Sequence, residues 1–310
     1  MRVVVVGAGG VGGLLAGLLA RGGTEVALLA RGRHLEAIGR DGLRVESPLG
    51  NFTVRLQAAD DPAALGRADT VLVAVKTWQV AEVAPSLRPL LGTGTVVVPL
   101  ENGVEASDTL AHALGEGSVG NGIVAVMSSI AAPGAIRHVG FTPRMTVGER
   151  RRGPSERLER LCQELKRAGV EARVADDVQV PLWQKFIFID PFGTVAAATR
   201  STAGELRSVP ESRALLASAM REVEAVARAR GVALPADTVD QALATVDSFP
   251  AEATASMQRD IQGGRRSELL EQTGAVVRLG RAAGVPTPVH EVLLACLLPQ
   301  EGRARRPASG

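Results

Sequence analysis

The sequence predicts an α/β fold class: an N-terminal domain built on a doubly wound parallel sheet, followed by an all-α C-terminal domain. Short runs of β-branched and other apolar residues alternate with helix-length segments through the first part of the chain, as is typical of a parallel sheet covered by helices. From about residue 178, helix-length segments follow one another with almost no strand-like alternation. We therefore expect one domain over residues 1–177, a second over 178–300 and a frayed tail over 301–310.

Each strand of the predicted sheet is a short apolar run that ends in glycine or polar residues. The first run, RVVVV, is followed at once by glycines and then by an apolar helical segment, as expected for a buried parallel strand that leads into a helix. The expected strands are residues 2–6, 25–31, 69–76 and 94–102. The expected helices between them include residues 11–20 and the segment WQVAEVAPSLRPLL, 78–91.

The remaining elements complete the two domains. Residues 118–148 are rich in glycine, serine and short alternating runs, and they predict an antiparallel extension of the same sheet. A helix at 154–168 and a strand at 170–174 are expected to close the first domain. The helices expected in the second domain are residues 181–200, 210–230, 236–263 and 266–283.

Composition excludes several classes of protein. The chain has 310 residues and a net charge of +2, which gives no basic footprint for a nucleic acid. Cys162 and Cys296 lie far apart without a CxxC pair or a histidine cluster, so we expect no metal site and no disulfide framework, as suits a reducing cytoplasm. The first residues lack the features of a signal peptide, and no apolar run approaches about 18 residues, so we expect no membrane partner.

Gly7, Gly9 and Gly12 form the pattern G-x-G-x-x-G at the turn between the first strand and the first helix. In this position the motif is typical of a dinucleotide-binding, Rossmann-type domain. The glycines permit a tight turn, close approach of a pyrophosphate and close packing of helix on strand. The backbone N–H groups at Gly10 and Val11 would meet the pyrophosphate at the positive end of the helix. The alternative is a tight strand-to-helix turn that binds nothing.

The residues after the second strand indicate which nicotinamide cofactor is bound. An NAD site has an acidic residue there, about 20 positions after the glycines, to hold the ribose hydroxyls. This chain has Ala30-Arg31-Gly32-Arg33 instead. A guanidinium suits the 2′-phosphate of NADP through bidentate, charge-assisted hydrogen bonds, so the sequence predicts NADP (NADPH). The alternative for Arg31 is an ordinary solvated loop charge.

Lys185 lies in the apolar segment PLWQKFIFIDPFG, between Trp183 and Phe186. A cationic donor beside a reacting carbonyl oxygen both stabilises the charge that develops on that oxygen and supplies a proton. Burial among aromatic side chains lowers the pKa of a lysine toward a useful range, whereas a nearby carboxylate raises it. The alternative is a lysine that extends along an amphipathic helix to solvent.

A series of motifs resembles the ketopantoate reductase (2-dehydropantoate 2-reductase) family. The motifs are GAGGVG at 7–12, VKTWQ at 75–79, ENG at 101–103, WQKF at 183–186 and SMQRDIQGGRRSE at 256–268. Each motif is weak by itself, but their order and spacing are specific, and the resemblance covers roughly residues 1–300. It implies NADPH-dependent reduction of a 2-oxo acid to a 2-hydroxy acid, the conversion of ketopantoate to pantoate in pantothenate biosynthesis.

The resemblance also implies roles for individual residues. Lys185 matches the catalytic lysine and Glu268 the acidic partner of the active site, whereas Ser256, Asn102 and Lys76 match positions near the substrate. Taken without the resemblance, Glu268 fits an exposed charged face, and Lys76 and Asn102 fit a polar strand end and a turn. The residues that match cofactor-binding positions are Gly7, Gly9, Gly10, Val11, Gly12, Arg31, Lys76, Gln79 and Asn102.

The chain departs from the family on the helix that carries Lys185. Family members usually have asparagine four and eight residues after the lysine, on the lysine's own face, where the amides help to hold the substrate with its 4-hydroxyl group. Ile189 and Gly193 occupy these positions here. Asp190 is the nearest polar residue, but it lies about 140° around a helix from Lys185, unless Pro191 distorts the helix.

This departure leaves three functions open. Reduction of a 2-oxo acid is better supported than ketopantoate as its substrate, because an apolar lining loses the preference for a hydroxyl. One alternative is an NADPH-dependent reductase of a more apolar 2-oxo acid or ketone, and another is a non-catalytic NADP(H)-binding sensor.

Apolar faces at 210–230 and 266–298 allow a homodimer. The four histidines form no cluster in the sequence and receive no role.

Overall fold

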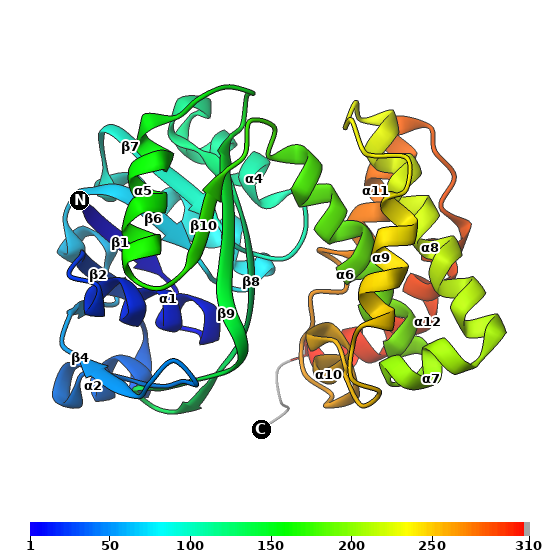
Figure 1. Cartoon of the computed structure of the whole chain (residues 1–310), viewed down its shortest axis with the longest axis horizontal. Helices are drawn as coiled ribbons and strands as arrows, with labels where there is room; N and C mark the ends of the chain where they lie inside the picture. Colours follow the sequence, from blue (N-terminus) through cyan, green and yellow to red (C-terminus); the bar gives the residue numbers. More distant parts are fainter. Residues whose placement is uncertain (307–310) are drawn as a thin grey trace. The chain divides into compact units, whose positions relative to one another are not determined.

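The computed structural model describes residues 1–306, which form two compact units. Unit 1 comprises Met1–Glu101 and Ala106–Val178, and unit 2 comprises Asn102–Glu105 together with the chain from Gln179 onward. Figure 1 shows a parallel sheet with helices in unit 1 and helices alone in unit 2. The predicted fold class is therefore confirmed.

The first sheet of unit 1 is parallel throughout and doubly wound. From the first strand the chain passes outward to one side of the sheet and then returns to build the other side, so the strand order is β5-β2-β1-β6-β7. Its strands are β1 (Arg2–Val6), β2 (Glu25–Leu29), β5 (Gln57–Ala59), β6 (Ala68–Val73) and β7 (Leu91–Pro99).

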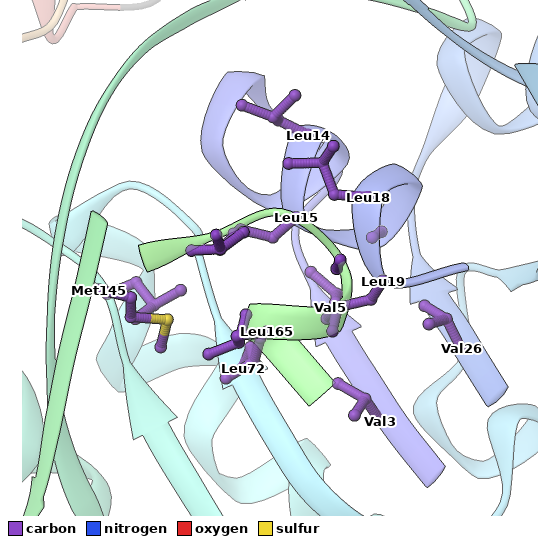
Figure 2. Packing of buried hydrophobic residues seen from close by; sticks show 14 of the residues in the cluster. Val3, Val5, Leu14, Leu15, Leu18, Leu19, Val26, Leu72, Met145 and Leu165 are labelled. Atoms are coloured by element: carbon purple, nitrogen blue, oxygen red, sulfur yellow. The ribbon is translucent and has the colours of Figure 1, made fainter. Parts of the chain in front are cut away.

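Both faces of this sheet are covered, which explains the unbroken run of valines in β1. Val3 and Val5 face helices α1 (Gly10–Arg21) and α5 (Glu156–Arg167), and Figure 2 shows them packed with leucines of these helices. The opposite face packs on short helices: η1 (Pro62–Leu65), α3 (Val80–Val83), η3 (Ala84–Leu90) and α4 (Ala106–Leu114). Another short helix, η2 (Thr77–Gln79), directly precedes α3 and has no buried residue. The helix expected at 78–91 is thus mostly 3-10, because Pro85 and Pro89 have no N–H group to donate.

A second, mixed sheet lies in the same unit, in the order β10-β9-β3-β4 with β8 paired to β9. The expected extension of the first sheet at 118–148 is wrong in this respect. The hairpin of β8 and β9 is antiparallel, but only the bridge between Val97 and Val119 joins this region to the first sheet, and β9 pairs with β3 and β10 instead. The further elements of unit 1 are α2 (Gly32–Asp41), β3 (Leu43–Glu46), β4 (Phe52–Val54), η4 (Glu116–Ser118), β8 (Gly120–Ala132), β9 (Ala135–Glu149) and β10 (Glu171–Val174).

Unit 2 is built around one long helix, α6 (Gln179–Thr199), which continues through Pro191 and is buried on most of its circumference. The other helices pack against it or against its immediate neighbours, as a helix that is apolar on all sides requires. They are α7 (Ala203–Ser208), α8 (Pro210–Ala229), α9 (Thr238–Asp247), α10 (Ser256–Gln262), α11 (Thr273–Ala283) and α12 (Pro288–Ala304). No helix within residues 1–306 is long and apolar enough to cross a membrane.

Three expectations for unit 2 need correction. The segment 236–263 contains two helices, and Pro250 lies in the turn between them. Helix α11 begins only at Thr273, because residues 266–272 form a turn in which backbone groups bond back to Glu268 and Leu269. The tail predicted to fray at 301–310 is helical as far as Ala304, and residues 307–310 lie outside the described part.

Candidate functional site

The glycine turn of unit 1 has the geometry that a pyrophosphate needs. Gly7 has a positive φ of 103°, and a Cβ atom there would lie 2.6 Å from the Ala74 carbonyl oxygen. At Gly12 a Cβ would lie 1.9 Å from the Gly7 carbonyl oxygen, so the helix cannot pack this closely with a side chain. A Cβ at Gly9, in contrast, would meet no atom within 4 Å. The turn therefore has steric room for a ligand only where the motif predicts one.

The residues at the start of α1 are held in place by the second sheet. Helix α1 begins at Gly10, and its first internal hydrogen bond runs from the Gly13 N–H to the Gly9 carbonyl at 2.8 Å. The N–H groups of Gly10 and Val11 belong to the first helical turn, which has no earlier helical carbonyl to bond. A Cβ at Gly10 would lie 2.4 Å from the Ser128 carbonyl oxygen of β8, so glycine is required there by packing.

Arg31 lies beside the glycine turn at the same edge of the sheet. The Gly7 N–H donates to the Leu29 carbonyl at the end of β2 (3.1 Å), and Arg31 follows as the N-cap residue of α2. Its side chain is exposed, and Ala30 and Gly32 flank it, so no carboxylate occupies the position that would recognise NAD. The local chemistry fits the 2′-phosphate of NADP.

Lys76 and Gln79 form a short turn after β6. The Lys76 N–H donates to the Gln79 side-chain oxygen at 3.1 Å, and the Gln79 N–H donates to the Lys76 carbonyl at 2.8 Å. The Lys76 ammonium is exposed and lies 5.5 Å from the centre of the Trp78 ring. Both residues thus follow the carboxyl end of a parallel strand, where open α/β sheets bind ligands.

Lys185 and Asn102 meet in unit 2, although they are far apart in the sequence. Asn102 follows β7, and its segment Asn102–Glu105 belongs to unit 2, where Val104 packs against the helical core. The Lys185 ammonium donates to the Asn102 side-chain oxygen at 2.9 Å. The side chain of Lys185 is partly buried, and this hydrogen bond joins its ammonium to the segment Asn102–Glu105.

The environment of Lys185 places its pKa near neutrality. Burial lowers the pKa from 10.5, and the negative charge of Glu268 raises it, so that the result is about 8. Glu268 is buried, and its carboxylate accepts a hydrogen bond from the Gln272 side chain at 3.1 Å. It does not belong to an exposed charged face, which was the alternative for this residue.

Ser256 lies on a different helix from Lys185. It is exposed at the first position of α10, directly before Met257, which is buried. The Met257 side chain faces Gly193 of α6: a Cβ atom at Gly193 would lie 3.1 Å from the Met257 Cε. Ile189 is partly buried against the helical core. The two positions at which asparagines were expected are therefore apolar in the fold as well as in the sequence.

A second buried polar cluster was missed by sequence reasoning. Asp190 and His290 are both fully buried, and the His290 Nε2 lies 3.0 Å from an Asp190 carboxylate oxygen. The other ring nitrogen lies 2.6 Å from the Glu222 carboxylate. Burial lowers the pKa of His290, but the hydrogen bonds with Asp190 and Glu222 outweigh it and raise the pKa to about 9. These residues come from three helices and share no local motif, so no spacing could have revealed them.

No group of three or more His, Cys, Asp or Glu side chains within residues 1–306 is arranged to hold a metal ion. The candidate site consists of one ammonium group (Lys185), one amide (Asn102) and one carboxylate (Glu268). Such a set suits proton transfer and the stabilisation of charge on oxygen.

Comparison with known proteins gives matches over nearly the whole chain. The family model "Ketopantoate reductase PanE/ApbA" matches residues 3–152, and its C-terminal counterpart matches residues 177–301. A protein of Mesorhizobium japonicum named 2-dehydropantoate 2-reductase is 32% identical, and the alignment covers 95% of this chain and 96% of that protein. A relative of the same name from Halobacterium salinarum is also 32% identical, over 94% of this chain and 96% of that protein.

A solved structure supports the same assignment. The PanE/ApbA family ketopantoate reductase of Ralstonia eutropha is 34% identical and superimposes with a TM-score of 0.90, covering 99% of this chain and 100% of that one. Both halves of the chain are thus matched by the same family. The chain belongs to the ketopantoate reductase family, and is an NADP-dependent oxidoreductase acting on a CH–OH group.

Proposed function

We propose that this enzyme reduces a 2-oxo acid to the 2-hydroxy acid with NADPH, and that Lys185 donates the proton. The observation that carries the proposal is the setting of Lys185, whose ammonium is bonded to Asn102 and has a pKa of about 8 beside Glu268. A group with this pKa is largely protonated at neutral pH and releases its proton readily.

Unit 1 would hold the cofactor. The N–H groups at the start of α1 would bind the pyrophosphate above Gly9, and Arg31 would pair with the 2′-phosphate, aided by Lys76 and Gln79. NADPH, when bound, supplies the hydride. The residues of unit 1 orient the dinucleotide and take no proton themselves.

The polar residues of unit 2 would act on the carbonyl group. Negative charge develops on the carbonyl oxygen as the carbon receives the hydride, and the Lys185 ammonium stabilises this charge and then gives its proton to the oxygen. The hydrogen bond to Asn102 orients the Lys185 ammonium. The negative charge of Glu268 raises the pKa of Lys185 and so favours its protonated form before the reaction. The products are the 2-hydroxy acid, NADP⁺ and a neutral Lys185, which regains a proton from solvent.

Ketopantoate is the first candidate substrate, because the relatives with 32% identity are named 2-dehydropantoate 2-reductase. A second candidate is a 2-oxo acid with a more apolar side chain. Gly193 with Met257 packed against it, and Ile189 one helical turn after Lys185, provide apolar surface where the resemblance led us to expect amides. Such a lining does not select a substrate hydroxyl.

The test is NADPH consumption by the purified full chain across a panel of 2-oxo acids that includes ketopantoate and branched and aromatic analogues. Lys185→Met serves as control, and we expect it to lower kcat by about 10²- to 10⁴-fold. The highest kcat/KM within the panel identifies the substrate. If the variant matched the parent, the role of Lys185 would be refuted, and NADPH binding without turnover of any carbonyl would instead indicate a sensor.

We also propose a homodimer in the cytoplasm. Val292 and Leu298 of α12 are apolar and exposed by 63% and 40%, which supports pairing through the helical unit. Cys296 is a free, exposed thiol, as suits a reducing compartment. Light scattering at several concentrations would measure the mass, and Val292→Glu should convert a dimer to monomer. A parent that stays monomeric would contradict the dimer.

A further inference from the structure

We infer that Asp190, acting through Thr273, is a positioning residue that holds Glu268 next to Lys185; this inference rests on the function proposed above. Asp190 lies on the same helix as Lys185, but its carboxylate points to a different set of partners. Its role would be to connect the helix that carries the proton donor to the turn that carries the donor's acidic partner.

The first step of the connection is the contact between α6 and α11. Asp190 is fully buried, and one of its carboxylate oxygens accepts a hydrogen bond from the Thr273 hydroxyl at 2.7 Å. The Thr194 hydroxyl lies 3.2 Å from the same oxygen and 2.6 Å from the Thr273 hydroxyl. Both threonines are fully buried, so this contact is not weakened by exchange with water.

The second step is the turn between Glu268 and Thr273. The Gln272 N–H donates to the Glu268 carbonyl at 2.8 Å, and the Gln272 side chain donates to the Glu268 carboxylate at 3.1 Å. Glu268 is therefore tied to the residue directly before Thr273, through both its backbone and its side chain. A shift of Thr273 relative to α6 would move this carboxylate relative to Lys185.

The third step explains why Asp190 itself stays in place. Its other carboxylate oxygen accepts from the His290 Nε2 at 3.0 Å, and the opposite ring nitrogen of His290 donates to Glu222 at 2.6 Å. Glu222 of α8 also accepts the N–H groups of Val289 and His290, at 2.8 and 3.0 Å. Asp190 is thereby braced by α8 and α12 through a buried imidazole that is charged at neutral pH.

Helix α6 has a particular need for such a brace. Pro191 has no N–H group, so the carbonyl of Ile187, four residues earlier, loses its helical hydrogen bond within one turn of Lys185. Asp190 lies directly beside this weak point. The contacts of its carboxylate compensate for the missing backbone bond, and they do so at the place where movement would most affect the proton donor.

The test uses Thr273→Val, which keeps the shape of the side chain and removes the hydroxyl that joins Asp190 to α11. Glu268 is the charged group that raises the pKa of Lys185, whereas Asn102 is neutral, so a looser Glu268 should lower this pKa. We expect a decrease of about half a unit or more and a fall in kcat of about tenfold. Asp190→Asn, which keeps an acceptor oxygen, should have a smaller effect in the same direction.

The readout does not depend on activity. The chain has three lysines, Lys76, Lys166 and Lys185, so the pH dependence of amine acetylation can be followed for each one by peptide mass spectrometry. Lys166 is exposed and serves as an internal reference. The matched control is Thr238→Val, which removes the hydroxyl of another buried threonine, one that donates to the Pro235 carbonyl at 2.8 Å.

The outcomes separate this inference from the proposed function. A lower Lys185 pKa in Thr273→Val but not in Thr238→Val supports the positioning role, even if the parent reduces none of the carbonyl compounds tested. An unchanged or raised Lys185 pKa in Thr273→Val overturns it, even if the parent is an active reductase. Equal shifts in both threonine variants would indicate a general loss of packing and would also overturn it.

Discussion

Lys185 is subject to two opposing influences, and their balance determines how the enzyme should respond to pH. Burial disfavours the ammonium form, and the carboxylate of Glu268 favours it, which leaves the pKa at about 8. A proton donor must carry its proton when the substrate arrives. The protonated fraction, and with it the reductase rate, should therefore be high near neutral pH and fall in mildly alkaline solution.

The pH profile gives the first prediction. For the parent, kcat should fall as the pH rises through about 8, because Lys185 then loses its proton. Glu268→Gln removes the charge that raises the pKa of Lys185, so the descending limb should move to lower pH. Stopped-flow kinetics with saturating NADPH at a series of pH values would measure both curves. An alkaline limb that stays in place in the variant would exclude Glu268 as the acidic partner.

Arg31 gives the second prediction. Arg31→Ala should weaken NADPH binding by about ten- to a hundredfold and leave NADH binding nearly unchanged, because only NADPH offers a 2′-phosphate to the guanidinium. Fluorescence titration with each nucleotide measures the two affinities. Arg33→Ala is the matched control, since Arg33 is exposed and two residues further along. Equal losses in both variants would point to general attraction by positive charge.

At the scale of elements, the glycines of the turn between β1 and α1 differ in whether packing leaves room for a side chain. A side chain at Gly12 would collide with the backbone of Gly7, whereas a side chain at Gly9 would enter open space. Gly9 also has a φ of −68°, which any residue adopts. The same motif therefore contains one glycine that the fold requires, Gly12, and one that the packing of the fold does not require, Gly9.

A matched pair of variants tests this distinction and forms the third prediction. Gly12→Ala should lower stability strongly, by about 2 kcal/mol or more, because α1 must move away from β1. Gly9→Ala should keep the parent's Tm but lose most NADPH affinity, because the methyl group occupies the approach of the pyrophosphate. Thermal unfolding and nucleotide titration measure both properties. Full NADPH affinity in Gly9→Ala would show that the turn binds nothing.

The elements also differ in how well the sequence predicts them. The four valines of β1 and the glycines after it are local signals, and the strand and the turn lie where they were expected. The hairpin of β8 and β9 was placed in the wrong sheet, because the choice of partner strand depends on packing against α1 rather than on the hairpin's own alternation. The single helix expected at 236–263 is wrong, because Pro250 breaks this segment into two helices.

In the candidate site, too, some residues could be predicted from the sequence and others could not. The family motifs led to Lys185, Asn102 and Glu268, and the fold brings these three residues of unit 2 together. His290 received no role, since it meets Asp190 only through the packing of α12 on α6, across 100 positions of sequence. Partners that are distant in the chain leave no periodic or spacing signal.

For the molecule as a whole, the buried His290 links stability to pH. Its pKa is about 9 in the fold, against 6.5 as the ordinary value, so folding favours the protonated ring. The stabilisation is complete below about pH 6.5 and is lost as the pH rises through 9. Lys185 acts in the opposite sense, since its lowered pKa makes folding more favourable as the pH rises from about 8 toward 10.5.

The fourth prediction isolates the contribution of His290. His290→Gln should cost about 3 kcal/mol more at pH 6 than at pH 9.5, because only the parent gains from protonation of the ring and Lys185 is present in both proteins. Thermal unfolding of parent and variant at the two pH values measures the difference. A gap in Tm that is the same at both pH values would indicate a neutral imidazole in the fold.

The segment Asn102–Glu105 belongs to unit 2, although it lies within the sequence of unit 1. This affects the design of chimeras that combine parts of this enzyme with parts of its relatives. A chimera joined near residue 178 would take Lys185 from one parent and its hydrogen-bond partner Asn102 from the other. Arg278 and Glu105, which form an ion pair at 2.7 Å, would be divided between the parents in the same way. Exchanging the helical unit intact therefore requires two grafts, one of them only four residues long.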